Sequence, residues 1–152
     1  MLRLALRAAG ADLAHINTMD IDTERVICAL AELPDGGCRG FTVGDGDWPL
    51  RGVILRAGDS VRAYLNWCPH AGHPLNLRPH GFLSPDGALL LCASHGALFE
   101  KDQGLCIAGP CAGKSLKPVL LRIEQGYALL DDSVDVAQLA AIGHRIVLDE
   151  GA

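Results

Sequence analysis

The chain has 152 residues, of which 49% are hydrophobic and 20% are charged, and its formal net charge at pH 7 is −5. This length is enough to bury a core as one domain without help from disulfides. The negative charge repels a phosphate backbone and so disfavours nucleic acid as a partner. No stretch approaches the roughly 18 consecutive apolar residues of a membrane span, so we expect no membrane partner.

Eighteen glycines and eight prolines, with little helical periodicity, predict a mostly β fold of short strands and many turns. The most regular hairpin joins 52–56 to 61–66 across the turn 57–60 and leads directly to Cys68. A short C-terminal helix is predicted over 133–142, with Asp132 or Ser133 as its N-cap and Gly143 at its end. The other predicted strands are 26–30, 39–43, 88–92, 119–123 and 127–130.

The sequence divides into one domain with two terminal segments. Residues 1–20 contain two arginines but no sustained apolar region or cleavage site typical of a secretory signal, and they resemble a transit peptide only weakly. We therefore predict a flexible leader over 1–20. The domain is expected over 21–131, and a C-terminal helix and tail over 132–152.

Two short motifs carry the chemistry. Cys68 and His70 are separated by one residue, and Cys92 and His95 by two, so each motif offers one thiolate and one imidazole to a common site. Pro69 stiffens the first motif, and Gly96 allows a tight turn after the second. Four such ligands suit either a closed tetrahedral zinc site or a two-iron, two-sulfide cluster. The mixed order favours the cluster, because zinc fingers usually take both cysteines from one loop and both histidines from another.

The motifs Cys68-Pro69-His70-Ala71-Gly72 and His95-Gly96-Ala97-Leu98-Phe99 resemble those of the Rieske iron–sulfur family. This resemblance implies stacked antiparallel sheets with a cluster-binding subdomain of two loops, holding one [2Fe-2S] cluster. It also implies that Cys68 and Cys92 bind one iron, while His70 and His95 bind the other through Nδ1. Neutral imidazoles in place of two thiolates make the cluster less negative and raise its reduction potential above that of all-cysteine clusters.

Several positions depart from the high-potential branch of the family. That branch has a disulfide between its two cluster loops, where this chain has His73 and Ser94, and hydroxyl donors where it has Ala97 and Phe99. Fewer donors stabilise the more negative reduced state less. We therefore expect a low-potential, ferredoxin-like protein, with His73 a solvent-facing neighbour of the site.

The resemblance implies a small protein that carries single electrons between a reductase and an acceptor such as an oxygenase. Two alternatives stay open: an auxiliary or regulatory subunit whose domain serves docking or redox sensing, and a structural zinc protein. No group of residues typical of a catalytic site stands out in the sequence.

The remaining cysteines have less distinctive settings. Cys106 and Cys111 are expected either as two reduced, packed thiols, the simpler interpretation, or as a local disulfide or redox-sensitive pair. Cys28 and Cys38 are expected to fill apolar space. Because two Cys/His pairs in a chain of this size suggest metal binding more than a disulfide framework, we expect a reducing compartment, the cytoplasm.

Overall fold

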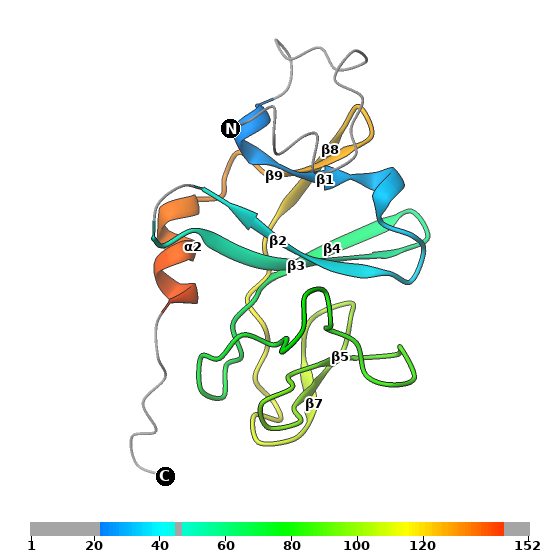
Figure 1. The fold of residues 1–152 in the computed structure, drawn as a ribbon, viewed down its shortest axis with the longest axis vertical. Helices are drawn as coiled ribbons and strands as arrows, with labels where there is room; N and C mark the ends of the chain where they lie inside the picture. The colour runs from blue at the N-terminus through cyan, green and yellow to red at the C-terminus, as the bar shows by residue number, and fades with distance from the viewer. Residues whose placement is uncertain (1–21, 45–46, 145–152) are drawn as a thin grey trace.

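In the part of the chain that the structure describes, three small antiparallel sheets are stacked one above another, and the helix α2 (Val136–Gly143) lies beside the middle sheet (Figure 1). The computed structural model describes residues 22–44 and 47–144, so the predicted leader over 1–20 lies outside the described residues. In the described part of the chain, no helix is long and apolar enough to cross a membrane. The mostly β, stacked-sheet prediction is confirmed.

The sheets differ in how far apart their strands lie in the sequence. The upper sheet joins the two ends of the described chain, in the order β1 (Val26–Ala29), β9 (Tyr127–Leu130), β8 (Leu121–Glu124). The middle sheet is a continuous meander of β2 (Cys38–Val43), β3 (Leu50–Ala57) and β4 (Ser60–Leu65). The lower sheet consists of β5 (Leu90–Leu91), β6 (Leu98–Phe99) and β7 (Cys106–Ala108). Short 3-10 turns span Thr23–Arg25 and Leu30–Glu32, and the helix α2 spans Val136–Gly143.

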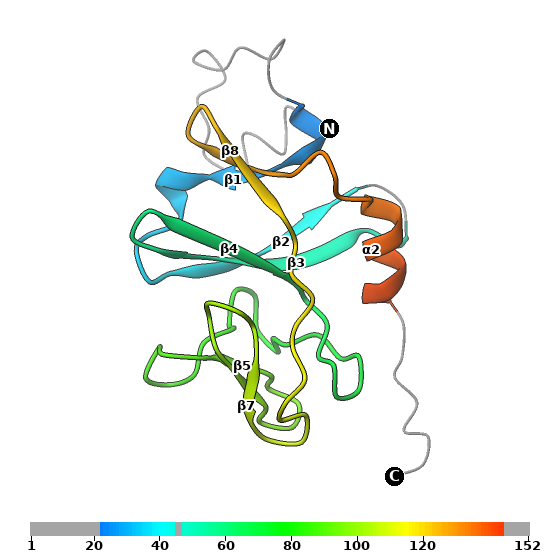
Figure 2. The same cartoon turned by 180° about the vertical axis from the view of Figure 1, so that it is seen from behind.

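Strand β3 separates two apolar cores. Successive side chains of a strand point to opposite faces. Leu50 and Ile54 therefore pack upward into a core shared with the upper sheet and α2, whereas Val53 and Leu55 pack downward into a core shared with the lower sheet. Figure 2 shows the same order of layers from behind. The lower core is the one that contains Cys68, Cys92, Cys106 and Cys111.

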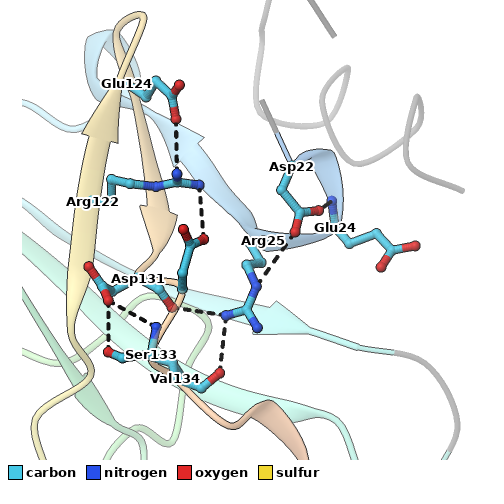
Figure 3. Close-up of polar contacts among 9 residues, drawn as sticks. Asp22, Glu24, Arg25, Arg122, Glu124, Asp131, Ser133 and Val134 are labelled. Carbon is cyan, nitrogen blue, oxygen red and sulfur yellow. Dashed lines mark hydrogen bonds and ion pairs between the residues drawn. The ribbon is translucent and has the colours of Figure 1, made fainter. Parts of the chain in front are cut away.

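Polar contacts fix the connection from β9 to α2 (Figure 3). The guanidinium of Arg25 donates to the backbone oxygens of Asp131 and Val134, at 2.9 and 3.1 Å. On β8, Arg122 forms ion pairs with Glu124 at 3.4 Å and with Asp132 at 3.5 Å. These contacts tie the start of the described chain to its C-terminal segment.

Three sequence-based boundaries were wrong. The helix begins at Val136 rather than residue 133, because the side chain of Asp131 accepts hydrogen bonds from the amide and hydroxyl of Ser133, forming a turn there. Asp135 is the N-cap, accepting from the amide of Gln138.

The predicted strand over 88–92 is reduced to β5, since Asp86 and Ser84 hold the preceding residues in a turn. The segment 105–115, in which no strand was predicted, contains β7, which pairs with β6.

Candidate metal centre

Two loops at the lower end of the molecule present the predicted ligands. The first leaves β4 and contains Cys68 and His70, and the second connects β5 to β6 and contains Cys92 and His95. Because β4 belongs to the middle sheet and β5 to the lower one, the site lies at the junction of two layers.

The first loop is closed by two backbone hydrogen bonds. The amide of Cys68 donates to the oxygen of His73 at 2.8 Å, and the amide of Gly72 donates to the oxygen of Cys68 at 2.7 Å. Gly72 has a φ of +79°, in the left-handed region that glycine adopts at little cost. The loop therefore folds back on its own cysteine and leaves His70 at its turn.

The second loop repeats this pattern. The amide of Cys92 donates to the oxygen of Ala97 at 2.9 Å, the amide of Gly96 donates to the oxygen of Cys92 at 2.9 Å, and Gly96 has a φ of +78°. The two loops thus have equivalent backbone closures, although the histidine follows the cysteine at a different spacing in each. A one-residue difference in sequence spacing is absorbed within the loop.

The four side chains lie as a pair of thiols and a pair of imidazoles. Cys68 and Cys92 are 2% and 1% exposed and belong to the same buried cluster. The rings of His70 and His95 have centroids 4.9 Å apart and are nearly perpendicular, at 88°. His70 is half-buried and His95 is exposed, so the thiols lie inside and one imidazole lies at the surface.

The two thiols differ in their electrostatic environment. The pKa of Cys92 is lowered to about 6, first because the Cys68 side chain donates a hydrogen bond to it, and further because the amides of Ser94 and His95 donate to its sulfur. The hydrogen bond to Cys92 and burial both raise the pKa of Cys68. Metal binding would release the thiol protons, since metals bind the thiolate.

The donor set fits an iron–sulfur cluster. Nδ1 of His70 is buried and has no hydrogen-bond partner, although an unpaired buried polar atom is costly and rare. A metal ion bound to Nδ1 would provide the partner that this nitrogen lacks. Within residues 22–44 and 47–144, no three Cys, His, Asp or Glu side chains are grouped so that they could hold one ion. A structural zinc requires four ligands around a single ion, whereas a two-iron cluster divides its ligands between two irons.

A third loop, residues 109–115, packs against the second. Gly109 has a φ of +97°, and a Cβ at this position would lie 2.7 Å from Cα of Ala97 and 3.3 Å from the oxygen of Gly96. Only glycine fits at this distance without displacing backbone. Beyond it, Cys111 is 2% exposed and lies 3.3 Å from Sγ of Cys106, with both cysteines free, as the simpler sequence interpretation predicted. Burial raises the pKa of Cys111 to about 11.

Comparison with known protein families identifies this arrangement. The model of the Rieske [2Fe-2S] domain matches residues 23–131, which is most of the chain. The protein belongs to the Rieske [2Fe-2S] domain family. The cofactor of this Rieske domain is therefore a [2Fe-2S] cluster. A search of curated proteins found no match.

Solved structures share the fold of the Rieske domain. The ferredoxin of carbazole 1,9a-dioxygenase from Nocardioides aromaticivorans IC177 is 25% identical, with a TM-score of 0.54, over 69% of this chain and 93% of that one. The ferredoxin of Sphingomonas yanoikuyae B1 is 23% identical, with a TM-score of 0.53, over 72% of this chain and 98% of that one. The terminal oxygenase of the Nocardioides system is 22% identical, with a TM-score of 0.55, over 72% of this chain but 30% of the oxygenase chain.

The structure confirms one predicted neighbour of the site in this Rieske domain and adds contacts that the sequence did not indicate. Ala97 and Phe99 are fully buried and offer no hydroxyl. His73 is exposed as predicted, yet its ring also stacks on His95, with centroids 5.8 Å apart and planes at 27°. Its backbone oxygen closes the first loop, which no side-chain pattern reveals.

Proposed function

We propose that this Rieske protein is a one-electron carrier in which Cys68 and Cys92 bind one iron and His70 and His95 bind the other through Nδ1. The observation that carries the proposal is the buried, unpartnered Nδ1 of His70 at the junction where two buried thiols and an exposed His95 meet. When bound, the cluster accepts and releases a single electron, at a potential raised by its neutral imidazole ligands.

Different groups of the protein have different roles in such a carrier. Burial of Cys68 and Cys92 keeps water away from the sulfur ligands, which protects them from exchange and oxidation. The amides of Ser94 and His95 donate to the sulfur of Cys92 and partly compensate its negative charge. The exposed ring of His95 provides the contact through which an electron reaches a docked protein.

The proposed partners are a reductase and an oxygenase or a similar acceptor. One structure with the same fold is described as a complex of reduced oxygenase and oxidised ferredoxin in carbazole 1,9a-dioxygenase, at 23% identity and a TM-score of 0.54. The comparison spans nearly all of the ferredoxin chains but less than a third of the oxygenase chain, which supports a ferredoxin-like role for this domain. All six cysteines are free, and this supports a reducing compartment, the cytoplasm.

We also propose a low reduction potential. Ala97 and Phe99 stand where the high-potential branch has hydroxyl donors. His73 and Ser94 stand where that branch has the two cysteines of its disulfide. A redox titration that gives a clearly positive midpoint near neutral pH would contradict this part of the proposal.

An absorption spectrum tests the cofactor and its ligands together. We expect a brown protein whose visible bands bleach when dithionite is added, and loss of these bands in Cys68→Ser and His70→Ala. A buried cysteine in the other core, Cys28, provides the matched control, because Cys28→Ala should keep the full spectrum. A colourless wild-type protein that contains zinc would refute the proposal.

A rate measurement separates a carrier from a regulatory subunit. The protein is mixed with a catalytic amount of a flavin-dependent reductase, NADH and a one-electron acceptor protein, and reduction of the acceptor is followed. A carrier turns over many times per molecule and its rate rises with its concentration. Turnover limited to a single reduction per molecule would instead indicate a docking or sensing role.

A further inference from the structure

We propose that a groove between the outer edge of β2 and the segment 74–82 binds an organic monocarboxylate with an apolar body. The groove has a volume of about 580 Å³, within the range of roughly 300–1,000 Å³ that small-molecule sites have. None of the four proposed cluster ligands lines it, so this site is separate from the metal centre.

The groove follows a strand edge that no other strand covers. In the described part of the chain, β2 lies at the end of the middle sheet, and β3 is the only strand paired with it. Residues 39–42 of β2 line the groove, with β1 of the upper sheet on one side and the segment 74–82 on the other (Figure 1). Three parts of the chain that are distant in sequence therefore form its walls.

The groove is positively charged, although the whole chain has a net charge of −5. Arg39 and Arg51 line it, and none of the described residues that line it is Asp or Glu. Arg39 is already paired with Glu32, at 2.9 Å. Within residues 22–44 and 47–144, the guanidinium of Arg51 has neither an ion pair nor a hydrogen bond. One uncompensated positive charge matches a monoanion better than a dianionic phosphate.

Two further groups can donate hydrogen bonds to the same ligand. Nδ1 of His80 accepts a hydrogen bond from the amide of Gly40 at 3.0 Å, so the neutral ring carries its proton on Nε2. Thr42 is exposed and lies directly opposite Arg51 in the pairing of β2 with β3. A carboxylate accepts several such bonds and pairs with a guanidinium through two parallel ones.

The backbone of His80 supports a binding role. Its φ is +59°, in the left-handed region, which costs free energy for any residue with a Cβ. The hydrogen bond from Gly40 holds the ring at the strand edge in this conformation. Strained residues are concentrated at sites that hold ligands. We therefore place His80 in the site as a fixed donor.

Apolar surface lies on both sides of these polar groups. Val26 and Ile27 on β1 are half-buried, and Pro79 on the opposite side is exposed. The ring of Phe82 packs directly on β2, since a Cβ on Gly40 would lie 3.2 Å from it. A ligand with a ring or a short hydrocarbon chain would cover this apolar surface, whereas a small inorganic anion would leave it in water.

Hydrogen bonds keep the lower wall in place. The side chain of Asn66 accepts from the amide of Leu75 at 2.7 Å and donates to the side chain of Asn76 at 2.9 Å. The oxygen of Leu75 in turn accepts from the amide of Ala93, in the second ligand loop, at 2.9 Å. Because the wall is already ordered, binding requires little loss of conformational freedom.

Calorimetric titration of the full-length, cluster-containing protein tests the ligand class. Phenylacetate serves as the probe, phenylacetamide has the same shape without the charge, and acetate has the charge without the ring. We expect saturable binding of one phenylacetate per chain, at least about tenfold tighter than that of the amide or of acetate. Phenyl phosphate should bind no more tightly than phenylacetate.

Variants test whether the binding occurs in this groove. Arg51→Gln should weaken phenylacetate binding by about tenfold or more, because it removes a hydrogen-bonded charge. Arg51→Lys keeps the charge but not the planar fork, so its affinity should lie between those of Arg51→Gln and the wild type. The matched control is Arg62→Gln, which removes the same charge from an exposed position on β4 outside the groove and should leave the affinity unchanged. Circular dichroism and the visible spectrum check that each variant is folded.

Several results would overturn the inference. These are no saturable binding of phenylacetate to the wild type, equal affinities for phenylacetate and its amide, tighter binding of phenyl phosphate, or equal losses in Arg51→Gln and Arg62→Gln. Because no proposed cluster ligand lines the groove, none of these results bears on the carrier function.

Discussion

Replacing Gly109 with alanine tests whether the third loop must lie directly on the second. In the structure, a Cβ on residue 109 would lie 2.7 Å from Cα of Ala97, closer than real Cβ atoms approach, and the atom it meets belongs to the backbone. To restore ordinary contact, the separation must grow from 2.7 Å to beyond 3.4 Å, which moves one loop away from the other. Gly109 also has a φ of +97°, a conformation that strains any other residue.

The expected loss of stability follows from these two effects, the close contact and the backbone strain. A substitution at Gly113 separates the two contributions. Gly113 lies in the same loop with a φ of +90°, but a Cβ there meets nothing within 4 Å. Gly113→Ala should therefore cost only the backbone strain, about 1–2 kcal/mol. Gly109→Ala adds an overpacking cost of about 1–3 kcal/mol, so the expected total loss is about 2–5 kcal/mol.

Denaturant unfolding measures the difference. The free energies of unfolding of wild type, Gly109→Ala and Gly113→Ala are obtained from far-ultraviolet circular dichroism in guanidinium chloride. The visible absorbance of the same samples reports whether the cluster is retained. If Gly109→Ala were no less stable than Gly113→Ala, the contact between residue 109 and Ala97 would not contribute, and the described loop packing would be wrong.

Three further predictions concern the site, the pH dependence and the helix. His70→Ala should abolish the visible spectrum, whereas His73→Ala should retain it, which metal analysis and absorbance check together. Burial raises the pKa of Tyr64 to about 12, from 10 in the unfolded chain, so the folded state binds the proton more tightly and stability should fall between about pH 10 and pH 12. Tyr64→Phe should weaken this alkaline loss and cost about 1 kcal/mol at neutral pH for the hydrogen bond to the oxygen of Lys101; pH-dependent unfolding curves that match the wild type would contradict it. Asp135→Ala removes the helix N-cap and should cost about 1 kcal/mol in thermal or denaturant unfolding, with no effect on the visible spectrum.

Local sequence patterns were sufficient for the middle sheet. Its strands are neighbours in sequence, and the turn at Gly58 brings Ala57 opposite Ser60, so pairing requires little long-range information. The two strands of the final hairpin were also predicted, although Glu124 extends β8 and the turn is limited to Gln125 and Gly126. The lower sheet was largely missed because its strands are two or three residues long, too short to show alternation.

The start of the helix was misplaced for a related reason. Asp131, Asp132, Ser133 and Asp135 are all good capping residues, so the sequence offers several equivalent N-caps. The choice of Asp135 depends on Arg25, which binds the backbone oxygens of the intervening turn from more than a hundred residues earlier in the chain. Such a distant contact leaves no local pattern.

The sequence by itself determined the chemistry of this Rieske protein. Thiol and imidazole are the donors that iron requires, and two short Cys/His motifs with glycines at the loop ends are local properties of the chain. Tertiary structure decided the environment of those donors: which imidazole is exposed, which nitrogen is buried without a partner, and that Cys111 belongs to the same buried cluster as Cys68. The physical reason is that burial and contact depend on the packing of three loops from two sheets, and residues 43 positions apart along the chain join one buried cluster only when that packing forms.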